Sequence, residues 1–65
     1  MRITVNGDET DVQATLLNDV LRECGYMHDR IATAINGDFV HTSARAQTRL
    51  QEGDRLEVVA PMSGG

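Results

Sequence analysis

The residues best placed to take part in chemistry are the last five, Pro61-Met62-Ser63-Gly64-Gly65, which follow the hydrophobic run Leu56-Glu57-Val58-Val59 and a single alanine. Two glycines without Cβ atoms make a thin tip that can enter a narrow channel on a partner protein. The Gly65 carboxylate is a poor electrophile, so an enzyme must activate it before it can act as an acyl donor. The pattern therefore predicts a tail that presents a carboxylate to a partner. The alternative is a terminus without a role of its own, because chain ends are often poorly ordered.

The other reactive side chains are isolated from one another in the sequence. Cys24 falls on the apolar stripe of a predicted helix, where a free cysteine usually acts as a small hydrophobic residue. His28 and His41, with Asp29 or Asp38, are conceivable metal ligands, but they lack the spacing of known zinc sites. No pair of carboxylates stands out as an acid and a base, and there is no phosphate-binding loop. We expect neither a catalytic residue, nor a metal site, nor a bound cofactor.

Composition restricts the class of protein. The 65 residues form one small domain, with 40% hydrophobic residues and a net charge of −4, which disfavours nucleic acid and favours a partner with a basic surface. No long apolar segment or signal peptide is present, so we expect no membrane association. The single cysteine suits a reducing compartment and a cytoplasmic protein. All six basic residues are arginine, so the chain has no lysine on which to build polymers of itself.

Periodicity predicts the elements that must position the tail. A helix is predicted over 16–24, because its apolar residues fall on one face; Thr15 is the expected N-cap and Gly25 the expected C-terminal glycine. Two Asn-Gly-Asp turns, at 6–8 and 36–38, predict hairpins. Residues 42–50 are expected to form a loop with a turn or two of helix, anchored by Leu50. The predicted strands are 1–6, 9–14, 31–35 (mostly buried), 39–41 and 55–60, the last with Leu56 and Val58 inward.

The predicted order is ββαββ, a short helix or turn, and a final β-strand. One amphipathic helix can bury its stripe only against one face of the sheet, so the fold class is α+β with two layers. We expect a domain over residues 1–60 and a flexible tail over residues 61–65.

This order, with its Gly-Gly end, resembles the ubiquitin-like β-grasp, and in particular the ThiS family, the bacterial sulfur carriers of thiamine biosynthesis within the ThiS/MoaD superfamily. The similarity extends along almost the whole chain. One departure is His41-Thr42-Ser43, where many ThiS proteins have a Pro-Arg step. The segments that carry the resemblance are Val5-Asn6-Gly7, the helix from Leu16 to Leu21, Ile31-Ala32-Thr33-Ala34-Ile35-Asn36-Gly37 with Phe39-Val40, and Leu50-Gln51-Glu52-Gly53-Asp54-Arg55-Leu56-Glu57-Val58-Val59.

The resemblance implies that Gly65 is the site of covalent modification. An E1-like adenylyltransferase (ThiF-like) would use ATP to convert its carboxylate to an acyl-adenylate. A sulfur donor system, a cysteine desulfurase or rhodanese, would then give a thiocarboxylate, and a thiazole synthase (ThiG-like) would take the sulfur. The chain itself would be a carrier and not an enzyme. Partners would recognise the tail through Met62, Ser63 and Gly64, and Val59 is a candidate for an apolar contact surface at its base.

Three alternatives stay open at the level of the sequence. The carrier could serve another pathway, such as the synthesis of molybdopterin, cysteine or a sulfur-containing natural product. The chain could be a ubiquitin-like modifier joined through Gly65 to lysines of other proteins. It could also be a β-grasp binding module whose terminal glycines have no role.

Overall fold

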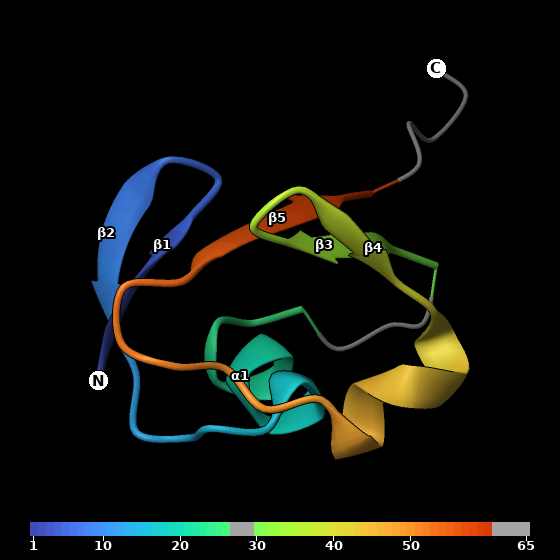
Figure 1. The fold of residues 1–65 in the computed structure, drawn as a ribbon, viewed down its shortest axis with the longest axis horizontal. Helices are drawn as coiled ribbons and strands as arrows, with labels where there is room; N and C mark the ends of the chain where they lie inside the picture. The colour runs from blue at the N-terminus through green and yellow to red at the C-terminus, as the bar shows by residue number, and fades with distance from the viewer. Residues whose placement is uncertain (27–29, 61–65) are drawn as a thin grey trace.

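The computed structural model describes residues 1–26 and 30–60, which form one sheet, one α-helix and one 3-10 helix (Figure 1). The order ββαββ, short helix, β is the predicted one. The elements are β1 (Arg2–Val5), β2 (Asp8–Asp11), α1 (Leu17–Glu23), β3 (Ala32–Ile35), β4 (Asp38–Val40), the 3-10 helix η1 (Thr42–Gln47) and β5 (Arg55–Val59). No helix among the described residues is long and apolar enough to cross a bilayer.

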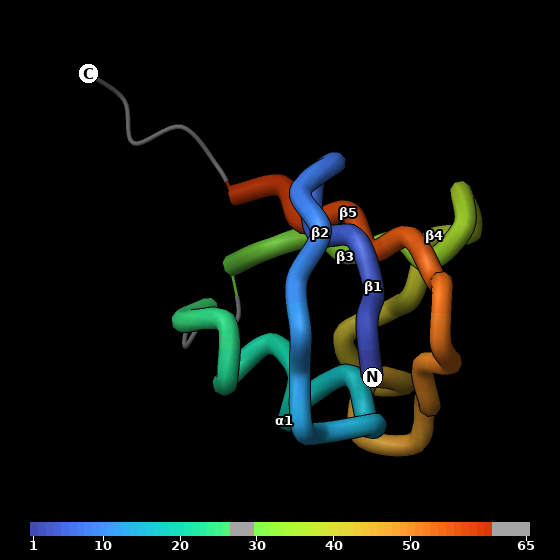
Figure 2. Tube along the Cα trace, turned by 90° about the vertical axis from the view of Figure 1, so that its left-hand side faces the viewer, coloured from blue at the N-terminus to red at the C-terminus, as the bar shows by residue number. Residues whose placement is uncertain are grey.

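The five strands form a single mixed sheet in the order β2-β1-β5-β3-β4. β5 lies at the centre, parallel to β1 and antiparallel to β3, and each outer pair is an antiparallel hairpin. α1 and η1 lie on the same side of this sheet, as the two perpendicular views show (Figures 1 and 2). The predicted two-layer α+β architecture is therefore confirmed.

Both predicted Asn-Gly hairpins are present. Asn6 and Gly7 have φ of 51° and 89°, and Asn36 and Gly37 have φ of 52° and 87°. Positive φ at both central residues defines the turn whose twist matches that of the strands it joins, and asparagine and glycine tolerate this conformation best.

The helix buries the predicted stripe, with Leu17, Val20 and Leu21 in the core. It ends at Glu23, with Cys24 as the C-cap, and Gly25 follows with a φ of 92°. The Gly25 N–H donates to the carbonyl of Arg22, and the Tyr26 N–H donates to the carbonyl of Leu21, at 3.1 and 2.8 Å. This pair of bonds is the Schellman arrangement, so the predicted role of Gly25 is confirmed.

The predicted N-cap, Thr15, is wrong. The N-cap residue is Leu16, and no side chain caps the helix. Thr15 is engaged elsewhere, because its hydroxyl accepts from Arg49 and its carbonyl accepts from the Leu50 N–H. The N–H of Leu17 instead donates to the backbone carbonyl of Thr48 at 2.8 Å. A tertiary backbone contact has replaced the local side-chain cap.

Strand β2 spans Asp8–Asp11, so it ends three residues before the end of the predicted segment 9–14. The Val12 N–H donates to the Met1 carbonyl, and the N-terminal ammonium donates to the Val12 carbonyl. Val12 is nevertheless buried. The core consists of ten residues from all parts of the described chain: Ile3, Val5, Val12, Leu17, Val20, Leu21, Ile31, Leu50, Leu56 and Val58.

Strand β3 is not mostly buried, contrary to the prediction for residues 31–35. Thr33 is buried, but Ala32 is exposed, and Ala34 and Ile35 are only half-buried. The reason is that the helices cover one face of the sheet, so alternate residues of β3 lie on the open face.

The polar segment 42–50 contains a buried cation that its composition did not reveal. The predicted short helix is present as η1, and Leu50 anchors it. Within η1, Arg45 is only 3% exposed; its guanidinium donates to the hydroxyl of Thr33 and to the carbonyl of Ile31. Arg45 therefore ties η1 to the start of β3.

Candidate functional site at the end of strand β5

The predicted tail residues Met62, Ser63, Gly64 and Gly65 lie outside the described residues. The structure describes the chain as far as Ala60, so it shows what the tail is attached to. The described part of the candidate site consists of the end of β5 and the surfaces that surround it.

Strand β5 fixes the base of the tail from the middle of the sheet. Leu56 and Val58 are 1% and 6% exposed and pack in the core, as predicted, whereas Glu57 and Val59 lie on the open face. β3 pairs with β5 up to its last residue, with Ala32 opposite Val59. β1 pairs only with the first two residues of β5, since β1 ends at the turn that begins with Asn6.

Asparagine side chains from both hairpin turns hold β5 in addition to the ladders. The Asn6 amide donates to the Val58 carbonyl at 3.1 Å and accepts from the Val58 N–H at 2.8 Å. At the other end of β5, the Asn36 amide accepts from the Arg55 N–H at 2.9 Å and donates to the Asp54 carboxylate at 3.0 Å. Sequence reasoning assigned both asparagines only a turn role and missed these contacts.

An apolar patch lies on the open face of the sheet beside the end of β5. Its two large members are Val59 and Phe39, which are 65% and 67% exposed. The sequence pointed to Val59 but not to Phe39, although the alternation along β4 could have placed Phe39 outward. We call this surface the tail-base patch; it surrounds a shallow hollow of about 160 Å³ and comprises Ala32, Ala34, Phe39, Glu57 and Val59.

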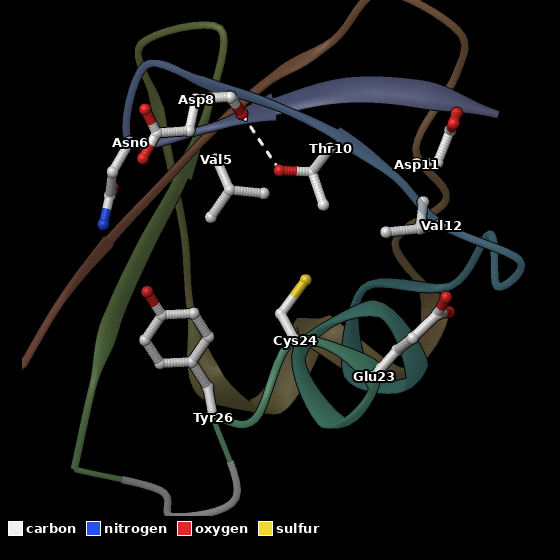
Figure 3. A pocket seen from close by; sticks show the side chains of 9 residues that line it. All are labelled: Val5, Asn6, Asp8, Thr10, Asp11, Val12, Glu23, Cys24 and Tyr26. Atoms are coloured by element: carbon white, nitrogen blue, oxygen red, sulfur yellow. Dashed lines mark hydrogen bonds between the residues drawn. The ribbon is translucent and has the colours of Figure 1, made fainter.

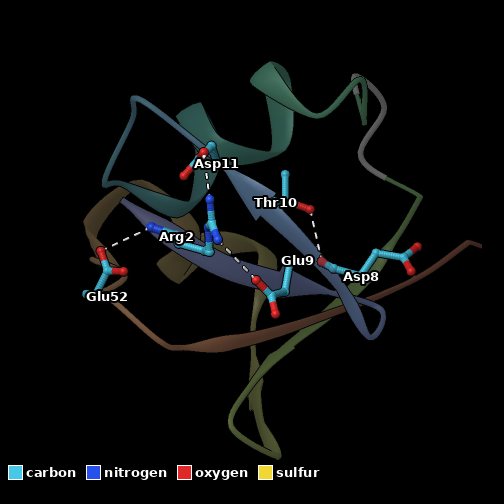
Figure 4. A network of polar contacts seen from close by, with 6 residues as sticks. All are labelled: Arg2, Asp8, Glu9, Thr10, Asp11 and Glu52. Atoms are coloured by element: carbon cyan, nitrogen blue, oxygen red, sulfur yellow. Dashed lines mark hydrogen bonds and ion pairs between the residues drawn. The ribbon is translucent and has the colours of Figure 1, made fainter.

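The opposite end of the same face is charged. The Arg2 guanidinium lies between the carboxylates of Glu9 and Asp11, at 3.3 Å from each, and the Arg2 N–H donates to Glu52 (Figure 4). These side chains are exposed, so the ion pairs contribute little to stability. The open face therefore has a charged half over β1 and β2 and an apolar half over β3 and β4.

Cys24 borders a groove of about 360 Å³ between α1 and the first hairpin (Figure 3). The thiol is half-buried; burial raises the pKa of Cys24, and the Glu23 carboxylate adds to that shift. A thiol with a raised pKa is a poor nucleophile at neutral pH. This environment agrees with the predicted structural role of Cys24. The groove is lined by Val5, Asn6, Asp8, Thr10, Asp11, Val12, Glu23, Cys24 and Tyr26.

The Glu23 side chain binds the loop between β2 and α1. Its carboxylate accepts hydrogen bonds from the backbone N–H groups of Gln13 and Ala14, at 2.9 to 3.1 Å. These bonds favour the ionised form and lower the pKa of Glu23 below its ordinary value. Glu23 thus connects the loop to the helix.

The histidine suggested as a metal ligand has a local structural role. The ring Nδ1 of His41 accepts from the Ser43 N–H at 3.3 Å and so caps η1, and the ring meets Phe39 edge-on at 6.2 Å. His28 and Asp29 lie outside the described residues. Within residues 1–26 and 30–60, no three histidine, cysteine, aspartate or glutamate side chains come together as metal ligands would.

Comparison with known proteins shows which family this chain resembles. The profile of the ThiS family matches residues 2–65. A curated thiazole synthase of Paramagnetospirillum magneticum is 33% identical over 66 residues, which cover all of this chain but only 20% of that protein. The chain therefore spans about a fifth of the length of this relative.

Two solved structures share the fold over the whole of this chain. The crystal structure of the thiamine biosynthesis protein ThiS of Geobacter metallireducens has a TM-score of 0.81 and 25% identity, and all of that chain is covered. A solution structure of a thiamine biosynthesis protein of the same organism gives the same TM-score and identity, with 88% of that chain covered. The predicted β-grasp is therefore confirmed.

Proposed function

This chain belongs to the ThiS family, and from that premise we propose that it is a sulfur carrier of thiamine biosynthesis whose reactive group is the Gly65 carboxylate. The observation that carries the proposal is the extent of the family match, which runs through the tail to Gly65. We propose a folded domain over residues 1–60, a tail over residues 61–65, and action in the cytoplasm.

The proposed chemistry requires a free carboxylate at Gly65. A carboxylate oxygen attacks the α-phosphorus of ATP on an E1-like adenylyltransferase, and pyrophosphate leaves. The resulting acyl-adenylate has a good leaving group, so the outer sulfur of a persulfide on a cysteine desulfurase or rhodanese can displace AMP and form an acyl disulfide. A second thiol then reduces the S–S bond, which releases the thiocarboxylate and leaves a disulfide between the two thiols. The terminal sulfur is then an anionic nucleophile, comparable to a thiolate. ATP and the catalytic groups belong to the partners, and this chain binds no cofactor of its own.

The base of the tail suits repeated use by several partners. Val58 is packed in the core, its N–H and carbonyl both bind the Asn6 amide, and Thr33 of β3 lies opposite it, so partners meet a fixed point of departure for the residues that follow. The tail-base patch offers them apolar surface within one or two residues of that point. We propose that partners contact Val59 there and read Met62, Ser63 and Gly64 in the tail.

The name of the curated relative favours thiazole synthase as the sulfur acceptor. That protein is named a thiazole synthase and contains a segment similar to this entire chain. A carrier and the enzyme it serves gain a high effective concentration when they share one polypeptide. This observation favours the thiamine pathway over the synthesis of molybdopterin, cysteine or a natural product.

The test is the intact mass of the chain after incubation with ATP, an E1-like partner and a sulfur source. We expect replacement of one oxygen by one sulfur at Gly65, and transfer of that sulfur when thiazole synthase and its other substrates are added. Deletion of Gly65 should abolish the modification and leave the melting temperature unchanged. An unmodified chain, with a partner that loads its own carrier, would refute the proposal. Adducts on lysines of other proteins would instead support the modifier alternative.

A further inference from the structure

We propose that Asn6 is a positioning residue for the activation of the tail: its side-chain amide acts as an extra rung of the sheet and sets the direction in which the chain leaves β5. The inference rests on the proposed function of the tail. It assigns Asn6 a role beyond that of a turn residue, and it concerns the partner's productive binding and not the stability of the fold.

The geometry is that of a peptide group supplied by a side chain. β1 ends at Val5, and the Asn6 N–H donates to the Leu56 carbonyl at 2.9 Å. The chain then turns away with φ of 51° at Asn6, while the Asn6 amide continues along β5 (Figure 3). Its Nδ2 donates to the Val58 carbonyl at 3.1 Å, and its Oδ1 accepts from the Val58 N–H at 2.8 Å. A peptide strand in the same place would likewise present one N–H donor and one carbonyl acceptor to Val58.

These bonds act two residues before Ala60, the last described residue. On the other edge of β5, Thr33 is the partner of Val58, and Ala32 is the partner of Val59. With Asn6 in place, the end of β5 is held from both sides, by the Asn6 amide at Val58 and by β3. Without its amide, only β3 would hold the end of β5, and the strand could swing away from the β1 side. A base that samples more directions loses more entropy when a partner fixes the tail in its channel.

Asn36 provides a matched control in the same sheet. It occupies the equivalent position of the second turn, with φ of 52°, and its amide also binds β5. Its contact is at Arg55, where β5 begins, far along the strand from the tail. Removal of either amide deletes two hydrogen bonds and should cost similar stability, whereas only Asn6 acts at the end that carries the tail.

The experiment compares Asn6→Gly with Asn36→Gly, because glycine keeps the positive φ and removes only the amide. The first measurement is hydrogen exchange of the backbone amides. The exchange rate of the Val58 N–H is compared with the rate expected from global unfolding of the same variant. On this scale it should be much faster in Asn6→Gly and equal to wild type in Asn36→Gly. The second measurement is adenylation by the E1-like partner. We expect KM for Asn6→Gly to rise about tenfold, equivalent to about 1.4 kcal/mol, with kcat nearly unchanged. KM for Asn36→Gly should stay within about twofold of the wild-type value, because this substitution acts far from the end of β5 that carries the tail.

Each result decides the inference. Equal KM values for the two variants, with wild type adenylated normally, would refute the role of Asn6 and leave the carrier function intact. Failure of wild type to be adenylated by an active partner would refute the proposed function, and this inference with it. If Asn6→Gly does not fold, Asn6→Asp serves in its place. The carboxylate can still accept from the Val58 N–H but places an oxygen against the Val58 carbonyl, so the same rise in KM is expected.

Discussion

Replacement of Val59 by serine tests whether partners bind the tail-base patch. Val59 is 65% exposed, so serine should change the free energy of unfolding by no more than about 0.5 kcal/mol. Full burial of a valine side chain contributes about 1.5 kcal/mol. The exposed 65% can therefore contribute about 1 kcal/mol to a complex, and its loss should weaken binding about fivefold.

Phe39→Ser applies the same reasoning to the larger side chain. A buried phenylalanine contributes about 3 kcal/mol, and the 67% still exposed corresponds to about 2 kcal/mol, or about thirtyfold in Kd. The assay is calorimetric titration of the E1-like partner with wild type, Val59→Ser and Phe39→Ser, with urea unfolding of each variant in parallel. Ala46→Ser is the control, because Ala46 is also exposed but belongs to η1.

Two outcomes would contradict this reasoning. If both patch variants bind as tightly as Ala46→Ser, the patch does not contact that partner. If Val59→Ser lowers the free energy of unfolding by more than about 1 kcal/mol, Val59 is more deeply packed than its exposure indicates.

The remaining predictions concern the fold. Leu21→Ala should cost about 2–5 kcal/mol of the roughly 3–10 kcal/mol expected for a chain of this size, measured by urea unfolding. Arg45→Met should cost about 1–3 kcal/mol, because the similar volume limits the cavity but the Ile31 carbonyl loses its buried donor. Glu23→Gln should destabilise at neutral pH, because the carboxylate that accepts from Gln13 is lost. Since folding lowers the pKa of Glu23, its contribution is complete above the ordinary glutamate pKa and is lost as pH falls through the lowered value, so the difference in urea midpoint between wild type and Glu23→Gln should close as the pH falls below the ordinary glutamate pKa.

Matched surface variants separate these effects from general damage. Asn18→Ala changes the exposed side of α1 and should not destabilise. Arg49→Met removes an exposed arginine that binds the Thr15 hydroxyl and should cost less than about 0.5 kcal/mol. A Leu21→Ala variant as stable as Asn18→Ala would refute the helix placement. Arg45→Met as mild as Arg49→Met would refute the burial of Arg45.

The features that sequence predicted best are those set by local chemistry. The apolar stripe of α1, the Asn-Gly turns and Gly25 each depend on residues a few positions apart, so a pattern in the chain is sufficient to find them. Leu56 and Val58 were placed inward by simple alternation, and that alternation also placed Val59 on the open face.

The features that sequence missed depend on residues far apart in the chain. The Leu17 N–H binds the carbonyl of Thr48, which no local pattern around Thr15 could indicate. Arg45 stands in a polar segment, and its burial follows only from the position of η1 over the start of β3. The open side of β3 was missed because a run of apolar residues resembles a strand covered on both faces, whereas here the helices cover only one.

The position of β5 explains why turn asparagines are recruited to hold it. β5 is last in sequence and central in the sheet, and neither of its neighbours is joined to it by a tight turn. Both neighbours end at a hairpin turn, but β1 runs parallel to β5 and β3 runs antiparallel to it, so the two turns lie beside opposite ends of β5. An asparagine in such a turn meets two requirements at once, since it tolerates positive φ and carries an amide that substitutes for a peptide group. Glycine meets only the first, so a glycine substitution at Asn6 or Asn36 isolates the second. The strand that bears the proposed reactive tail is therefore secured by side chains whose contribution can be removed without changing the turns.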